Sequence, residues 1–195
     1  MGIKDRIGFS VFAKPVSTPL HTVDRTKLTK FHDDYGELCA RINPDRESEW
    51  RSRGLDDLPV LLTVPGVAEI GVSLEHARLH ILTERIHARD HAGTWRTIGE
   101  IIATYYVTTK SLSFENVTHA QRSASITGSN SVYAHPHILN GTMCFSASRR
   151  LLDLFLEARV SQAMRLLIPA LRMEDFITRN TAYHEIECWP LKEGN

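Results

Sequence analysis

The sequence has no long hydrophobic run and no excess of charge of either sign, and each absence excludes a class of protein. No stretch approaches the roughly 18 consecutive apolar residues of a membrane-spanning helix, so we predict no membrane association. Lysine plus arginine and aspartate plus glutamate number 23 each, so no net charge favours binding to nucleic acid. The first residues lead into no apolar run, and we expect no secretory signal.

Cysteine is also scarce. The three thiols, Cys39, Cys144 and Cys188, are odd in number and widely spaced. They indicate no disulfide framework and fit a reducing cytoplasm. A glycine-rich phosphate loop, a nucleophile elbow and an internal repeat are absent as well, and we expect no cofactor.

A helix is predicted in the first quarter of the chain. Prolines argue against regular structure over residues 1–22, whereas apolar side chains recur at three- and four-residue steps from Leu28 to Ile42. Asp24 is a candidate N-cap, and Asn43-Pro44 is a stop signal. The charged segment 46–57 contains a glycine and is interpreted as a linker or exposed turn.

Strands are predicted in the middle of the chain and helices after it. Segments 67–72, 79–86, 98–107 and 110–117 are rich in β-branched and aromatic residues. The polar segment 118–131 is predicted to be a loop. Apolar faces at helical spacing follow residue 150, and Pro169 is expected to kink or interrupt the second helix. This order predicts an α+β fold, with helices packed on an antiparallel sheet.

The most informative segment carries a His-Pro-His triplet at residues 135–137, seven residues before Cys144. The proline fixes its own φ and favours an extended conformation at the residue before it. Asn140-Gly141 is a turn-prone pair. The thiol therefore follows two tight bends, which is how a chain presents a side chain at a surface groove.

This segment resembles the active site of ubiquitin-conjugating enzymes, in which a His-Pro-Asn triplet precedes a thioester-forming cysteine, after a first helix and a four-stranded meander. It looks closer to the prokaryotic and phage relatives of that family, which also carry Ala-Tyr and then Trp after the helices, as Ala182-Tyr183 and Trp189 do here. The resemblance covers about 59–189. Here His137 replaces the asparagine, and the spacing to the cysteine is one residue shorter.

The resemblance implies a ubiquitin-conjugating-like domain over 58–195, with an antiparallel four-stranded meander and flanking helices. Residues 1–57 would form an N-terminal extension with one amphipathic helix. The expected location is the cytoplasm of a bacterial host, or the virion if the protein is structural.

It also implies a chemistry. Cys144 would accept a ubiquitin-like C-terminus as a thioester and pass it to an amine, with an activating enzyme and a ubiquitin-like protein as partners. His137 would donate a hydrogen bond to the oxyanion, and a protonated imidazole nearby would lower the pKa of the thiol. His135, in the same catalytic segment, is expected to brace the turn. Substrate-groove residues would be Tyr133, Asn140 and Phe145.

Other interpretations stay open. Between Met143 and Phe145, Cys144 has the surroundings of a buried structural cysteine. The chain would then be a catalytically silent binding or structural module, for instance one that contacts phage structural proteins. A Cys-His hydrolase or isopeptidase is a third option.

A metal site was also weighed: His135, His137 and Cys144, completed by Cys188 or His184. Because no Cys-x-x-Cys pair exists, we predict no metal. The remaining thiols are expected to be structural, with Cys39 in the helix core and Cys188 in a tail packed on the sheet. His76, His80, His87 and His91 are interpreted as solvated or strand-surface residues.

Overall fold

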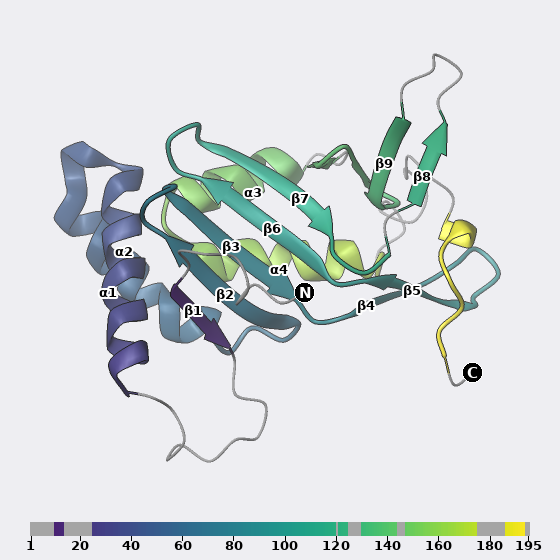
Figure 1. The fold of residues 1–195 in the computed structure, drawn as a ribbon, viewed down its shortest axis with the longest axis horizontal. Helices are drawn as coiled ribbons and strands as arrows, with labels where there is room; N and C mark the ends of the chain where they lie inside the picture. The colour runs from purple at the N-terminus through teal and green to yellow at the C-terminus, as the bar shows by residue number, and fades with distance from the viewer. Residues whose placement is uncertain are drawn as a thin grey trace.

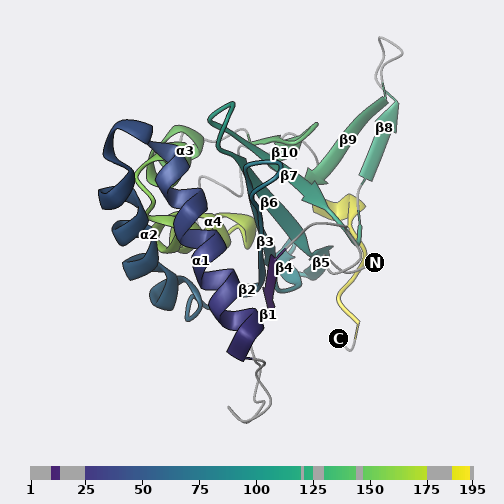
Figure 2. The same ribbon diagram turned by 60° about the vertical axis from the view of Figure 1, so that its left-hand side comes forward.

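The computed structural model describes residues 10–13, 25–119, 121–124, 130–143, 147–174 and 186–193. Within them, helices gather on one face of a twisted antiparallel sheet, as the side view in Figure 2 shows. This confirms the predicted α+β class. None of the described helices is both long enough and apolar enough to cross a membrane.

Two helices begin the helical layer: α1 (Arg25–Ile42) and α2 (Glu47–Leu61), joined through the short 3-10 turn η3 (Pro44–Arg46). The predicted stop at Asn43-Pro44 is confirmed, since α1 ends at Ile42. The predicted linker at 46–57 is wrong, because α2 occupies it. Its buried residues form one stripe at helical spacing: Trp50, Gly54, Leu58 and Leu61.

That stripe was missed because one of its members is a glycine. Gly54 lies directly against Cys39 of α1: a Cβ added at Gly54 would stand 2.7 Å from the Cys39 Cβ. Glycine has a low helix propensity, but because Gly54 has no side chain, α1 and α2 can come this close together. The predicted domain boundary at 57/58 falls inside α2, and the two-part division stays a prediction.

The main sheet has five strands in the order β1-β2-β3-β6-β7, all antiparallel (Figure 1). Its members are β1 (Ser10–Ala13), β2 (Val67–Ser73), β3 (Arg78–Thr83), β6 (Ile101–Tyr106) and β7 (Ser111–Asn116). The last four correspond to the predicted meander. The edge strand β1 was not predicted, because four residues are too few to show a clear alternation.

A hairpin of β4 (Ile86–Arg89) and β5 (Trp95–Gly99) is inserted between β3 and β6. The sequence predicted one strand over 98–107, whereas the structure breaks it at Gly99. Gly99 has a φ of +111°, and a Cβ there would stand 2.9 Å from the Asn116 Oδ1. The break is therefore a sharp bend that only glycine permits.

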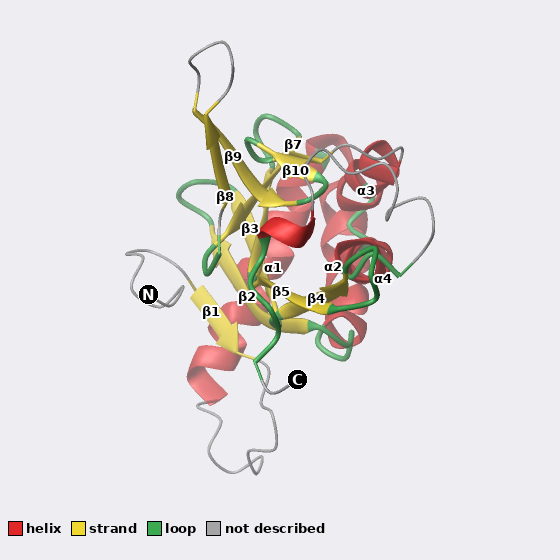
Figure 3. Ribbon diagram, turned by 90° about the vertical axis from the view of Figure 1, so that its right-hand side faces the viewer, coloured by secondary structure: helices red, strands yellow, loops and turns green. Residues whose placement is uncertain are grey.

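A second sheet, in the order β11-β10-β9-β8, carries the motif. Its strands are β8 (Gln121–Ala124), β9 (Asn130–His135), β10 (Ile138–Leu139) and β11 (Thr142–Met143). Figure 3 shows β8 and β9 projecting away from the helices. The predicted loop over 118–131 is thus wrong in part, because its polar residues hide two strand segments from an alternation test.

The helical layer is completed by α3 (Ala147–Leu156) and α4 (Val160–Leu171), which pack on each other, and α4 also packs on α2. Pro169 does not interrupt α4, which continues to Leu171, and the alternative expectation of a kink stays a prediction. The N-terminus of α4 is tied to α2, since the Asp57 carboxylate accepts a hydrogen bond from the Ser161 N–H at 2.7 Å. Near the C-terminus, η4 (Ile186–Cys188) leads into the buried Trp189.

Candidate functional site

The His-Pro-His triplet forms the turn between β9 and β10. Its strands pair with Ile138 opposite His135 and Leu139 opposite Tyr133. The turn is buried rather than exposed, because neither His135 nor His137 has measurable solvent exposure. The first predicted bend therefore exists, and its two imidazoles point into the protein.

His135 is held by both ring nitrogens. Its Nδ1 accepts a hydrogen bond from the His137 N–H at 3.0 Å, so that nitrogen carries no proton. Its Nε2 therefore carries the proton and donates it to the Leu171 carbonyl oxygen at 2.7 Å, at the end of α4. The turn is thereby fastened to the helical layer through one neutral ring, as expected for a bracing residue.

Burial keeps that ring neutral. Desolvation, with His137 as a smaller cause, lowers the pKa of His135 to about 3, while the bond to the Leu171 carbonyl opposes this shift. At neutral pH His135 carries no charge, so it is not the protonated imidazole that would lower the pKa of a nearby thiol. With both nitrogens engaged, it has no lone pair to offer a metal.

His137 stacks on His135. The ring centroids are 5.7 Å apart, and the planes are inclined by 26°. In this conformation the covered ring reaches a substrate oxyanion only after its surroundings move. The predicted oxyanion role of His137 stays a prediction.

The second bend is a two-residue hairpin between β10 and β11. Asn140 and Gly141 have φ values of +48° and +80°, the positive pair that suits such a hairpin. The Asn140 N–H donates to the Val132 carbonyl and its Oδ1 accepts from the Val132 N–H, both at 2.9 Å. Asn140 is exposed and bonds to β9, and its predicted place in a substrate groove stays a prediction.

The other predicted site residues divide into two groups. Tyr133 is half-buried and packs against the hydrophobic core. Cys144 and Phe145 lie outside the described residues, as do Ala182 and Tyr183. The predicted roles of Tyr133, Cys144 and Phe145 stay predictions.

The other two thiols differ sharply in environment. Cys39 is buried in the helix core, as expected, and desolvation with the nearby Asp57 carboxylate raises its pKa to about 12. Cys188 is exposed on η4. Among the described residues, no group of three histidine, cysteine or acidic side chains is placed to hold a metal ion.

A buried amide that the sequence did not single out ties the motif to the rest of the fold. The Asn116 Nδ2 donates to the carbonyl oxygens of Ile98 at 2.7 Å and Ala134 at 2.8 Å. Its Oδ1 accepts from the backbone N–H groups of Thr118 and His119 at 2.9 and 2.6 Å. Asn116 thus joins β5, β7 and the residue before the His-Pro-His turn.

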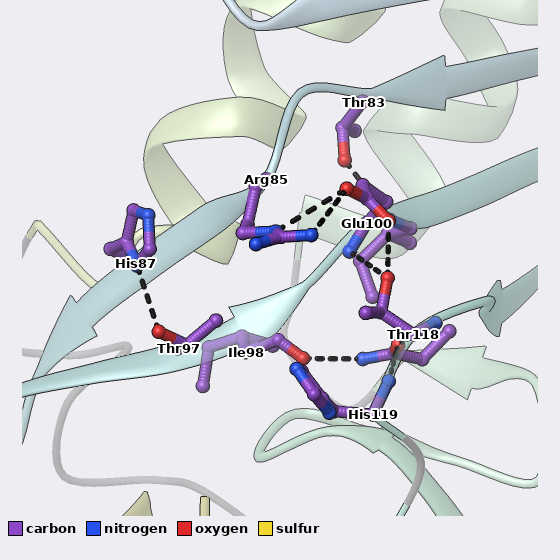
Figure 4. A network of polar contacts seen from close by, with 10 residues as sticks. Thr83, Arg85, His87, Thr97, Ile98, Glu100, Thr118 and His119 are labelled. Carbon is purple, nitrogen blue, oxygen red and sulfur yellow. Dashed lines mark hydrogen bonds and ion pairs between the residues drawn. The ribbon is translucent and has the colours of Figure 1, made fainter. Parts of the chain in front are cut away.

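On the β5 side of this amide lies a cavity of about 260 Å³. Its polar lining comes from the β4–β5 hairpin, the segment after β7 and the C-terminal segment: Arg85, His87, Thr97, His119, Lys192 and Glu193. Figure 4 shows how most of these side chains lie around one space. The sequence did not indicate this site because its residues are spread over more than a hundred positions, from Arg85 to Glu193.

Of the four histidines interpreted as surface residues, two are exposed and two are not. His76 and His91 are exposed, as predicted. His80 is buried, and its Nδ1 pairs with the Thr104 hydroxyl at 2.9 Å, so the surface interpretation is wrong for it. His87 is partly buried in the wall of the cavity. Alternation alone cannot distinguish the two faces of a sheet when both are covered in places.

The chain was compared with protein-family models, curated proteins and solved structures, and no significant match was found in any of them.

Proposed function

We propose that this chain is a ubiquitin-conjugating-like protein that carries a ubiquitin-like modifier as a thioester on Cys144 and transfers it to an amine. Its partners would be an activating enzyme and the modifier. The finer identity of the fold is part of the same proposal. Support comes from the order of the elements: helices, the β2-β3-β6-β7 strands, the motif turn, then α3 and α4.

The braced turn carries the proposal. A nucleophile in acyl transfer needs a backbone that holds its position, because misplacement of the reacting atoms raises the barrier. Two consecutive bends precede Cys144: one locked by His135 onto Leu171, the other locked by Asn140 onto Val132. The Gly141 carbonyl also accepts from the Phe114 N–H at 3.0 Å, which fixes the second bend to β7.

The chemistry requires two balanced steps. The Cys144 thiolate attacks the activated carbonyl at the modifier's C-terminus, a C–S bond forms, and the activating group leaves. An amine then attacks the same carbonyl: a C–N bond forms, the C–S bond breaks, and the amine proton passes to a base. Because His135 is neutral, the charge that favours the thiolate has to come from another group.

A catalytically silent module of the same fold is the second candidate, for example a phage structural protein. The observation that favours it is the complete burial of both motif imidazoles. Buried rings stabilise a fold without contacting a substrate, and fold alone does not determine function.

Thiol labelling distinguishes the two candidates. In a Cys188→Ser background the exposed thiol is removed, and Cys39 is buried with a raised pKa, so iodoacetamide reports on Cys144. Rapid modification that is lost in the matched Cys188→Ser/Cys144→Ala variant supports the thioester proposal. A folded protein whose Cys144 does not react contradicts it and favours the silent module.

The transfer itself is tested by incubating the Cys188→Ser protein with a candidate activating enzyme, ATP and a candidate ubiquitin-like modifier. A reductant-sensitive adduct on a non-reducing gel is expected, and Cys144→Ala should abolish it. An adduct that persists in Cys144→Ala, or one that resists reductant, would place the chemistry elsewhere.

A further inference from the structure

The cavity beside β5 collects cationic and imidazole side chains from three separated segments. Arg85 lies between β3 and β4, His87 is on β4, His119 follows β7 and Lys192 is in the C-terminal segment. At about 260 Å³ the cavity is slightly smaller than the roughly 300–1,000 Å³ of sites that enclose drug-sized ligands. A ligand held here would be small.

The walls of this cavity are fixed by backbone hydrogen bonds. The Thr97 N–H donates to the Pro190 carbonyl at 2.8 Å, and the Lys192 N–H donates to the Trp95 carbonyl at 3.0 Å. The C-terminal segment therefore runs alongside β5. On the opposite side, Asn116 Oδ1 holds the backbone of His119. The polar groups are thus positioned before any ligand arrives, which lowers the cost of binding.

The Arg85 guanidinium is oriented by an ion pair with Glu100 that uses only some of its N–H donors. Its Nε and one terminal nitrogen each lie 3.3 Å from one Glu100 oxygen, and the other Glu100 oxygen accepts from the Thr118 hydroxyl. A guanidinium has five N–H donors in a fixed fork, so this pairing leaves donors of Arg85 available to a ligand. The Glu100 carboxylate acts as a support that sets the direction of the fork.

The lysine adds a second cation to the cavity, and the His87 ring is held in a defined orientation. Lys192 lies with its ammonium 5.5 Å from the centroid of the Trp95 ring. The His87 ring is oriented by its Nδ1, 3.2 Å from the Thr97 hydroxyl. Desolvation, then Lys192 and Arg85, lower the pKa of His87, which is the response of an imidazole in a positive environment.

We propose that this cavity binds a small molecule through a phosphate group, held by Arg85 and Lys192, with the His87 and His119 rings beside it. Glu193 also lines the cavity, and Glu100 pairs with Arg85, so these two carboxylates balance the positive charges of Arg85 and Lys192.

The test is a titration with inorganic phosphate at constant ionic strength, followed by NMR of the histidine ring protons. Saturable shifts are expected for His87 and His119, and none for the exposed His32 and His76. A parallel titration with phosphoserine distinguishes a phosphomonoester from the free ion, and acetate tests whether any carboxylate suffices.

Variants complete the design. Lys192→Ala should weaken phosphate binding by about tenfold, the loss expected for one charge-assisted contact. Arg85→Lys, which keeps the charge but loses the fork, should weaken it as well. Lys30→Ala, on the exposed face of α1, is the matched control and should leave it unchanged. Shifts spread evenly over all histidines, or affinity unaffected by both cavity variants, would overturn the proposal.

Discussion

At the residue scale, the structure depends on buried polar groups whose hydrogen bonds are made. Asn116 is 8% exposed, and both ends of its amide are bonded, twice as donor and twice as acceptor. His135 is fully buried and uses both ring nitrogens. Such groups add little to the free energy of unfolding while they are paired. Removing one partner leaves the other buried without a hydrogen bond, which lowers that free energy strongly.

Asn116→Ala should therefore be strongly destabilising. The change leaves the carbonyls of Ile98 and Ala134 and the N–H groups of Thr118 and His119 without this partner, at about 1–3 kcal/mol for each that stays buried. We expect a fall of more than about 3 kcal/mol in the free energy of unfolding, measured by urea denaturation. Thr108→Ala, in the exposed β6–β7 turn, is the control and should change it little.

His135 should make the protein acid-sensitive. Its pKa is about 3 in the folded chain and about 6.5 in an unfolded one, so the unfolded state binds more protons between these values. Stability is therefore complete above about pH 6.5 and falls by up to about 1.4 kcal/mol per pH unit as the pH drops toward 3.

The check is His135→Gln, whose amide can replace both hydrogen bonds but does not titrate. The pH dependence of its unfolding free energy should be shallower than that of the unchanged chain by about one proton over this window. Equal slopes in the two proteins would contradict the neutral, buried state of His135.

At the scale of elements, two glycines determine how segments meet. Gly54 sets the approach of α2 to α1, and Gly141 closes the β10–β11 hairpin against β7. In neither case did the sequence alone indicate the contact. Gly54 is a helix-breaking residue inside a helix, and Gly141 was recognised as a turn residue but not as one that packs against β7.

Gly54→Ala should destabilise the protein although alanine is the better helix former by about 1 kcal/mol. The new Cβ would collide with the Cys39 Sγ and Cβ, so the two helices would have to separate. Gly36→Ala on α1 is the matched comparison. Its Cβ meets only the Leu55 side chain at 3.2–3.3 Å, which can shift, so we expect a change in melting temperature near zero there.

Gly141→Ala should cost more than Gly93→Ala. Both glycines have similar φ values, +80° and +83°, so the backbone penalty of about 1–2 kcal/mol is shared. Only at Gly141 does a Cβ also come within 2.8 Å of a neighbour, the Ser113 Oγ, whereas at Gly93 nothing lies within 4 Å. If Ser113→Ala narrows the difference in unfolding free energy, the contact is its cause.

Local patterns predicted α1, the last four strands of the main sheet and the two bends of the motif, because periodicity and turn residues act over a few positions. They did not predict the edge strand β1. They did not predict α2, whose stripe includes Gly54, or the break in the sheet at Gly99. Nor did they predict that both imidazoles of the motif are buried. His135 bonds to the carbonyl of Leu171, which lies 36 residues further along the chain, and no local pattern encodes a contact at that distance.

At the scale of the whole molecule, the C-terminal segment packs against a strand from the middle of the chain. Residues 190–193 run beside β5, and Trp189 is buried next to them. The candidate site was hardest to predict here, since the cavity draws on residues from 85 to 193. Cationic residues scattered in this way look like ordinary surface until the fold brings them together.

Ending the chain after Trp189 should loosen the β4–β5 hairpin. The Thr97 amide would lose its acceptor, the Pro190 carbonyl, and the Trp95 carbonyl would lose the Lys192 donor. Hydrogen exchange at Thr97 should accelerate, since its protection depends on that bond. A chain that ends after Glu193 keeps both bonds and should retain the protection.

The Asn116 amide connects the β5 strand beside the cavity to the His-Pro-His turn. One carbonyl it binds belongs to a cavity wall, and the other immediately precedes the motif turn. The backbone of β5 and the residue before the buried turn are therefore held by the same side chain. One interior amide thus links parts of the chain that lie far apart in the sequence.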